Sequence, residues 1–128
     1  MKKLLPLPLI CLGVTTVHAG TGLDFSDVTS REKAEALHAH GKLEKILLFP
    51  SEFGGKDIPQ NSVFVPPSIS EIKNRLTGTL VRFVGEGQIN KLTVEPKYKG
   101  DSFIPSRIKM RAWHTDKKGE FTPSIEVW

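Results

Sequence analysis

The stretch from Ser68 to Val84 constrains the fold of this chain more than any other part of the sequence. Large apolar residues recur there at spacings of three and four: Ile69, Ile72, Leu76, Leu80 and Phe83. This spacing places them on one side of an α-helix, as in a helix that lies on a hydrophobic core. We therefore predict one long helix over about 68–85. Its charged residues fall off the apolar stripe: Lys73, Arg75, Arg82 and Glu86.

Both ends of this helix carry recognisable signals. Ser68 followed by Glu71 has the spacing of a capping box, in which each side chain bonds the backbone N–H of the other residue. Gly85 and Gly87 can adopt the left-handed conformation in which helices commonly end. The sequence thus predicts a helix that begins at a capped Ser68 and ends near Gly85.

Residues 1–19 have the pattern of a secretory signal peptide. A charged start precedes an apolar run from Leu4 to Val14, which is too short to span a bilayer. Val17 and Ala19 are compact residues at the positions that a signal peptidase reads, so we predict cleavage after Ala19. The protein is then expected to be periplasmic or secreted, with no membrane attachment after processing.

The processed chain is expected to be a single domain. Cys11, the only cysteine of the sequence, would leave with the signal peptide, so residues 20–128 can form no disulfide. The stability of the processed chain must therefore come from its hydrophobic core. The short charged N-terminal region and the lack of disulfides suit a protein of the bacterial periplasm. Residues 20–29 are predicted to form a loose leader that Leu23 and Phe25 could attach to the body.

The remaining segments predict an α+β fold. Ser30 caps an expected short helix over about 31–40, and Gly41 follows it. Apolar runs and alternating patterns predict strands at 42–49, 63–65, 89–98, 103–114 and 121–128. We expect a small antiparallel-rich sheet with the long helix packed across one face.

The last two predicted strands suggest a register. If residues 116–119 form a four-residue turn, Met110 faces Ile125 on the apolar side. On the polar side, the same register pairs Lys109 with Glu126 and Arg107 with Trp128. A slip by one residue would break every pair, because it exchanges the two faces of the strand.

No motif in the sequence names a reaction. A nucleophile elbow and a phosphate-binding loop are both absent, and the chain after residue 19 has no cysteine nucleophile. His38 and His40 lie two residues apart, which points them to different sides of a helix, and His114 adjoins a turn. We therefore predict no catalytic residues, no metal site and no cofactor; these missing motifs weigh against an enzyme without deciding the matter.

The most distinctive predicted surface is basic and aromatic. Between residues 91 and 118 there are eight basic and three acidic residues. The binding residues predicted for this region are Arg107, Lys109, Arg111, Trp113 and Trp128, together with the 51–60 loop. Such a surface suits an acidic protein partner, since Arg and Trp are enriched in interface anchors. The alternative is an ordinary solvated sheet face. Nucleic acid is disfavoured by the signal peptide and by the small charge after processing.

These observations favour a small exported protein that acts by binding another protein. An inhibitor or an immunity-type antagonist of a toxin or hydrolase is one concrete form of this hypothesis. The first alternative is a small periplasmic hydrolase that uses His114 with Glu52 or Asp57. The second alternative is a structural subunit that assembles through its C-terminal strand, and a homodimer is compatible with each hypothesis.

Overall fold

A computed structural model describes residues 16–18, for their backbone only, and residues 23–128. Most of the predicted signal peptide therefore lies outside the described residues. The helices are α1 (Arg31–Ala39) and α2 (Pro67–Gly85). The strands are β1 (Thr16–His18), β2 (Glu44–Leu47), β3 (Ser62–Val65), β4 (Lys91–Tyr98), β5 (Pro105–Trp113), β6 (Glu120–Phe121) and β7 (Ser124–Glu126).

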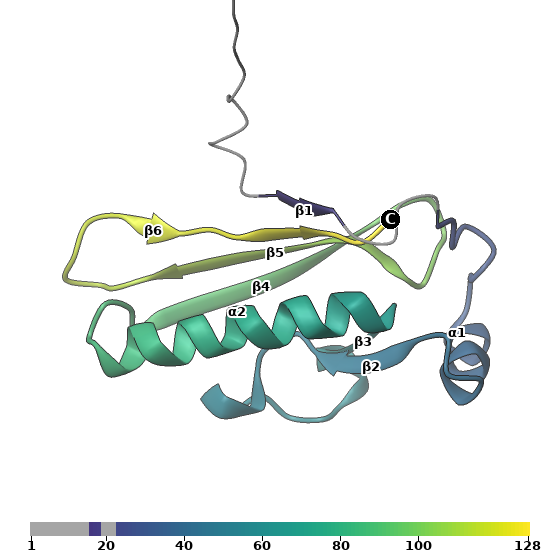
Figure 1. The fold of residues 1–128 in the computed structure, drawn as a ribbon, viewed down its shortest axis with the longest axis horizontal. Coiled ribbons are helices and arrows are strands. Elements are labelled where there is room, and N and C mark those ends of the chain that lie inside the picture. Colours follow the sequence, from purple (N-terminus) through teal and green to yellow (C-terminus); the bar gives the residue numbers. More distant parts are fainter. Residues whose placement is uncertain (1–15, 19–22) are drawn as a thin grey trace, which may run out of the picture.

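The fold is α+β, as the sequence predicts, and its strands form two sheets. The larger sheet has the order β1-β7-β5-β4, with β6 pairing the far end of β5. Its pairs are antiparallel except for β1, which runs parallel to β7. The strands β2 and β3 form a separate antiparallel pair. Figure 1 shows α2 lying between the long strands β4 and β5 and the β2–β3 pair.

The predicted long helix is present, but its predicted cap is wrong. The helix begins at Pro67, and Pro66 in the capping position provides no side-chain hydrogen bond. The carbonyl of Pro66 accepts from the N–H of Ile69 at 2.9 Å. Proline at the first helical position already has a suitable φ and no N–H to satisfy, so the helix starts one residue before Ser68. The short helix α1, in contrast, has the predicted cap: the N–H of Lys33 donates to Ser30 Oγ at 3.2 Å.

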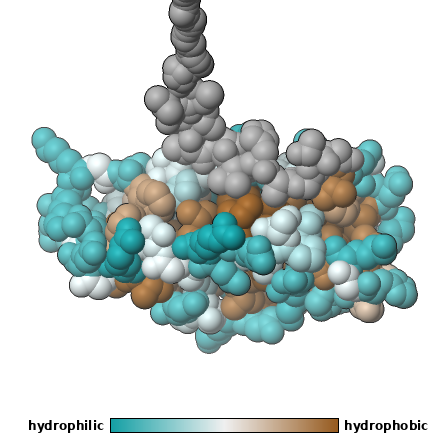
Figure 2. Space-filling model, in the orientation of Figure 1, coloured by the Kyte–Doolittle hydropathy of each residue, from teal (hydrophilic) through white to brown (hydrophobic). Residues whose placement is uncertain are grey.

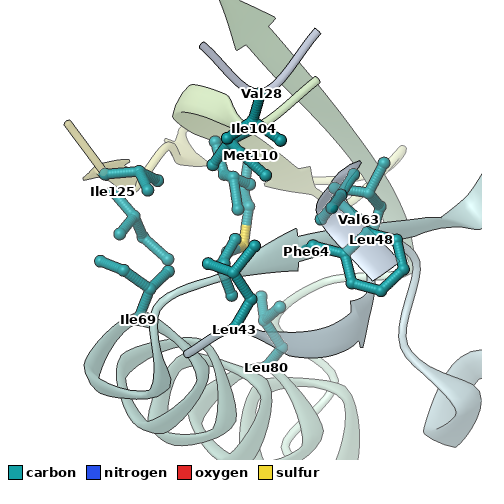
Figure 3. Close-up of a cluster of buried hydrophobic side chains, with 14 of the residues drawn as sticks. Val28, Leu43, Leu48, Val63, Phe64, Ile69, Leu80, Ile104, Met110 and Ile125 are labelled. Atoms are coloured by element: carbon teal, nitrogen blue, oxygen red, sulfur yellow. The ribbon is translucent and has the colours of Figure 1, made fainter. Parts of the chain in front are cut away.

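The core fills the space between α2 and the two sheets. Ile69 and Leu80 of α2 are fully buried, as are Ile108 of β5 and Ile125 of β7. Figure 3 shows Ile69 pointing towards Ile125, and Leu80 near Leu43. The other predicted stripe residues, Ile72, Leu76 and Phe83, are partly buried against this core. The apolar stripe thus faces the core as predicted.

The predicted register of the C-terminal strands is wrong by two residues. Ile108 pairs with Ile125, and Arg107 pairs with Glu126. The turn is longer than predicted, since the last pair before it joins Trp113 to Glu120. A shift of two residues keeps every side chain on its original face, so the alternating pattern cannot distinguish the two registers. The observed register places Arg107 beside a carboxylate instead of beside Trp128.

Several residues of the described part of the 20–29 segment contact the body of the protein. Val28 is buried, and its carbonyl accepts from the N–H of Phe103 at 2.6 Å. The ring of Phe25 packs edge-on against Trp128, with 6.0 Å between centroids, whereas Leu23 is exposed. Phe25 therefore makes the attachment that the sequence suggested for this segment.

Hydrophilic residues separate the hydrophobic patches on the surface of the molecule. On the face shown in Figure 2, hydrophobic residues form separate patches among hydrophilic ones. Within residues 16–18 and 23–128, neither helix has the length and apolar character needed to cross a bilayer.

Candidate functional site

The outer face of the large sheet carries four of the five residues that the sequence singled out. Arg107, Lys109 and Arg111 alternate along β5 and are exposed, while the residues between them are buried. Trp113 ends the same row and is half-buried. Each cation has cross-strand neighbours: Lys97 and Glu126 for Arg107, Glu95 and Ser124 for Lys109, and Thr93 for Arg111.

Two of these cations are paired within the sheet. Arg107 Nη2 donates to Glu126 Oε1 at 2.8 Å, and its Nε also contacts Glu126, so the pair is bidentate. Arg111 Nε donates to Glu120 Oε2 at 2.7 Å. That hydrogen bond lowers the pKa of Glu120 and raises the pKa of Arg111. These carboxylates offset part of the positive potential that the sequence suggested for this face.

Lys109 differs from the two arginines. In the described part of the chain it forms no ion pair and no side-chain hydrogen bond, although it lies in the row between them. The Arg111 guanidinium stacks on the Trp113 ring, with 3.9 Å from Cζ to the ring centroid. A free ammonium and a rigid Arg–Trp stack therefore lie next to each other on β5.

A hollow opens in this face beside Lys109. Thr122 and Pro123 interrupt the strand between β6 and β7, and the N–H of Met110 donates to the carbonyl of Pro123 at 2.9 Å. A cavity of about 380 Å³ lies there, which we call the Lys109 hollow. Its lining residues are Thr93, Glu95, Lys109, Met110, Arg111, Thr122, Pro123 and Ser124. The Ser124 hydroxyl is buried without a hydrogen-bond partner among the described residues.

Trp128, the fifth predicted residue, lies apart from the hollow. Its indole N–H donates to the carbonyl of Ile104 at 3.1 Å, at the opposite end of β5 from Trp113. Lys99 Nζ lies 4.7 Å from the centre of the Trp128 ring, and Phe25 packs against its edge. These contacts give Trp128 a packing role in the chain itself.

The residues of the hydrolase alternative do not converge. His114 Nδ1 accepts from the N–H of Asp116 at 2.9 Å, and Asp57 forms an ion pair with Lys45. Glu52 lines a different cavity from His114. No hydrogen bond among the described residues joins any two of these three side chains. His38 is engaged elsewhere, with its Nδ1 2.9 Å from the carbonyl oxygen of Leu43.

The side chain of Asn61 makes several of the contacts that hold the 51–60 loop, beside the ion pair of Asp57 with Lys45. Asn61 Oδ1 accepts from the N–H of Phe49 at 2.8 Å, and Asn61 Nδ2 donates to the carbonyls of Phe49 and Lys56. Short 3-10 turns form at Ser51–Phe53 and Pro59–Asn61. Gly55 is required, because a Cβ there would lie 1.8 Å from the Phe49 carbonyl oxygen.

A second polar site involves a residue that sequence reasoning placed away from the buried face. Lys73 is only 3% exposed, and its ammonium donates to the carbonyl of Leu47 at 3.0 Å. Burial lowers the pKa of Lys73 from 10.5 to about 8, while the negative charge of nearby Glu52 opposes the shift. Ser70 and Thr77, on the same side of α2, are buried as well.

The sequence contains one faint signal of this second site. Ser70, Lys73 and Thr77 are spaced three and four apart, so they form a polar stripe that borders the apolar one. A polar stripe on a helix normally faces solvent. It becomes informative only when β2 is known to pack against α2.

The comparisons with known proteins return no match: no family model, no curated protein and no solved structure is similar to this chain. The two polar sites and the N-terminal pattern are therefore the features that bear on its function.

Proposed function

We propose that this chain is an exported protein that acts by binding another protein, and that the Lys109 hollow lies at the centre of the binding surface. The observation that carries the proposal is the hollow itself, where Lys109 and Ser124 lie on neighbouring strands and neither side chain has a hydrogen-bond partner among the described residues. A carboxylate from a partner would accept from the Lys109 ammonium, because the Lys109 side chain is exposed. The partner is therefore expected to present an acidic surface.

The surroundings of the hollow suit protein recognition. The Arg111–Trp113 stack at one side is a rigid amphipathic feature of the kind that anchors interfaces. The paired carboxylates Glu120 and Glu126 limit the net charge, which favours a defined partner over a polyanion such as nucleic acid. The small size and the signal pattern support one concrete form, an inhibitor or immunity-type antagonist of a secreted toxin or hydrolase.

Export follows in this proposal from the N-terminal pattern. Cleavage after Ala19 would remove β1, the parallel neighbour of Ser124, Ile125 and Glu126. The edge of β7, next to the hollow, would then be open to a partner. Intact mass measurement of protein recovered from the periplasm of an expressing bacterium tests this step. A chain starting at Gly20 is expected, and a chain that keeps its first residues in the cytoplasm would overturn it.

The binding test uses the periplasmic protein as bait in periplasmic extract, with partners identified by mass spectrometry. One dominant partner is expected, and its binding should weaken as salt rises, because complementary charges are screened. The variant Lys109→Ala/Arg111→Ala should lose this partner. The matched control is Lys117→Ala/Lys118→Ala, which removes two cations from the exposed turn and should keep the partner.

The outcomes of this test show whether the Lys109 hollow or the net charge of the protein is responsible for binding. Loss of the partner in both variants would mean that net charge alone drives binding. Retention in both would show that the hollow is not the site. Circular dichroism of each variant must match the original protein, because these side chains are exposed and their loss should leave the fold intact.

One observation favours the second alternative, assembly of copies through the C-terminal strand. β7 accepts β1 as a neighbour, which supports an edge competent to pair with a further strand once β1 is gone. This alternative predicts that the processed protein associates with increasing concentration in analytical ultracentrifugation. A strictly monomeric processed chain would count against it and leave the hollow as the better proposal.

A further inference from the structure

A polar cavity lies where α2 packs against β2, on the side of the helix that adjoins the apolar stripe. It has a volume of about 260 Å³, and α2, β2 and the first 3-10 turn contribute its walls. The residues that line this space, which we call the Lys73 cavity, are Lys45, Ile46, Leu47, Pro50, Ser51, Glu52, Ser70, Lys73, Asn74 and Thr77. Its volume is below the usual range for drug-sized ligands, so it suits a molecule of only a few non-hydrogen atoms.

The ammonium of Lys73 has unused hydrogen-bonding capacity in this cavity. An ammonium carries three N–H donors, and Lys73 uses one of them on the carbonyl of Leu47. Among the described residues no carboxylate lies within ion-pair distance of its Nζ. A buried charge with unsatisfied donors is costly to the fold, and such a cost is commonly retained where the group binds a ligand.

Glu52 supplies the opposite charge at the edge of the same cavity. It is exposed, accepts a hydrogen bond only from Ser51 Oγ at 3.3 Å, and forms no ion pair within the described residues. Its charge acts on Lys73 without a direct contact. Lys45, the other charged residue of the lining, is paired with Asp57. Among the described residues, the cavity therefore holds one cation without an ion pair at depth and one anion without an ion pair at its rim.

We infer that the Lys73 cavity binds a small zwitterion of the α-amino acid class. The carboxylate of the ligand would accept from Lys73 Nζ, and its ammonium group would donate to Glu52. Ser51, Ser70 and Asn74 add neutral hydrogen-bonding groups, which suit a small polar side chain. A simple anion would be repelled by Glu52, and a simple cation would be repelled by Lys73. This inference does not depend on the proposed protein partner, which would bind a different surface.

The test is a titration of the full chain, followed by NMR of its backbone amides. Glycine and serine are the zwitterionic probes, while acetate, methylamine and inorganic phosphate carry charge of one sign. Saturable shifts are expected for the zwitterions at residues 51–52 and 70–77. Acetate, methylamine and phosphate should each bind at least about tenfold more weakly.

Two variants assign the roles of the charges. Lys73→Met should abolish saturable zwitterion binding. Glu52→Gln should weaken the binding of glycine by about tenfold, while acetate should bind this variant as well as the original protein or better. Lys109→Met, on the other face of the molecule, is the matched control and should bind glycine normally. The thermal melting of Lys73→Met must show a folded protein, which we expect because methionine fills a similar volume.

Several outcomes would overturn the inference. Equal binding of acetate and glycine, unaffected by Glu52→Gln, would indicate an anion site. An absence of saturable shifts with every probe would assign Lys73 to the structural support of Leu47 alone. Normal glycine binding by Lys73→Met would place the ligand elsewhere.

Discussion

Two adjoining sides of α2 are buried, and they differ in chemistry. The side towards the large sheet carries Ile69 and Leu80, which belong to the apolar core. The side towards β2 carries Ser70, Lys73 and Thr77, which are also buried but border a polar cavity. The first side stabilises the fold by removing apolar surface from water. The second side buries a charge at a cost, so it is the better candidate for a function.

The largest expected effect concerns the apolar side. Leu80→Ala should lower the free energy of unfolding by about 2–5 kcal/mol, because it leaves a cavity in a fully buried position. Val81→Ala, at the adjacent position, is 43% exposed and should change the stability by about 0.5 kcal/mol or less. Chemical denaturation of both variants measures the difference. Equal losses would show that α2 is oriented otherwise.

The polar side should respond in the opposite direction. Lys73→Met should raise the free energy of unfolding at pH 7 by up to about 3 kcal/mol, the cost implied by a pKa lowered from 10.5 to about 8. The carbonyl of Leu47 loses a donor, but it borders the cavity and water can replace it. Denaturant titration at pH 7 measures the change. A clear loss of stability would mean that the Lys73–Leu47 hydrogen bond outweighs the desolvation of the ammonium.

The difference in unfolding free energy between the original protein and Lys73→Met should depend on pH. Between about pH 8 and 10.5 the folded Lys73 is neutral while the unfolded lysine keeps its proton, so the unfolded state binds more protons. Stability of the original protein therefore rises through this window relative to Lys73→Met, and the difference should shrink by about 3 kcal/mol. Groups outside the cavity are present in both proteins, so their contributions cancel in the difference. A difference that is constant with pH would contradict the lowered pKa.

A smaller effect is expected from the loop that closes the polar side. Gly55→Ala forces a Cβ against the carbonyl of Phe49, so the loop must shift and the cavity wall with it. A loss of about 1–3 kcal/mol is expected from such local strain. Gly54 has a positive φ but open space around it, so Gly54→Asn, which tolerates that conformation, is the control. Thermal unfolding distinguishes the two, and equal melting temperatures would contradict the tight contact at Gly55.

The smallest expected effect concerns the start of the helix that carries both sides. Ser68→Ala should change the stability by no more than about 0.5 kcal/mol, because Ser68 is exposed and α2 begins before it. Ser30→Ala should cost about 1 kcal/mol, since Ser30 accepts the capping hydrogen bond of α1. If Ser68→Ala lost as much stability as Ser30→Ala, the result would support the predicted capping box at Ser68. Denaturation of the two variants under the same conditions decides between them.

Much of the fold could be predicted because it depends on local periodicity. The stripe of α2, the cap of α1 and the inward and outward faces of β5 each follow from residues close together in the sequence. Lys109 and Arg111, two of the exposed residues that line the Lys109 hollow, are predicted from that same alternation. Their function as a binding surface stays a prediction.

The remaining features depend on contacts between distant segments, which periodicity does not encode. The order of residues along the chain predicts the apolar stripe of α2 and the two faces of β5, because side-chain direction repeats every two residues in a strand and every 3.6 in a helix. The tertiary structure set the pairing of Arg107 with Glu126, since registers two residues apart have identical faces. It also decided that Lys73 is buried, because β2 packs against a side of α2 whose residues are polar. A lysine beside an apolar stripe is exposed or buried according to what the rest of the chain places over it.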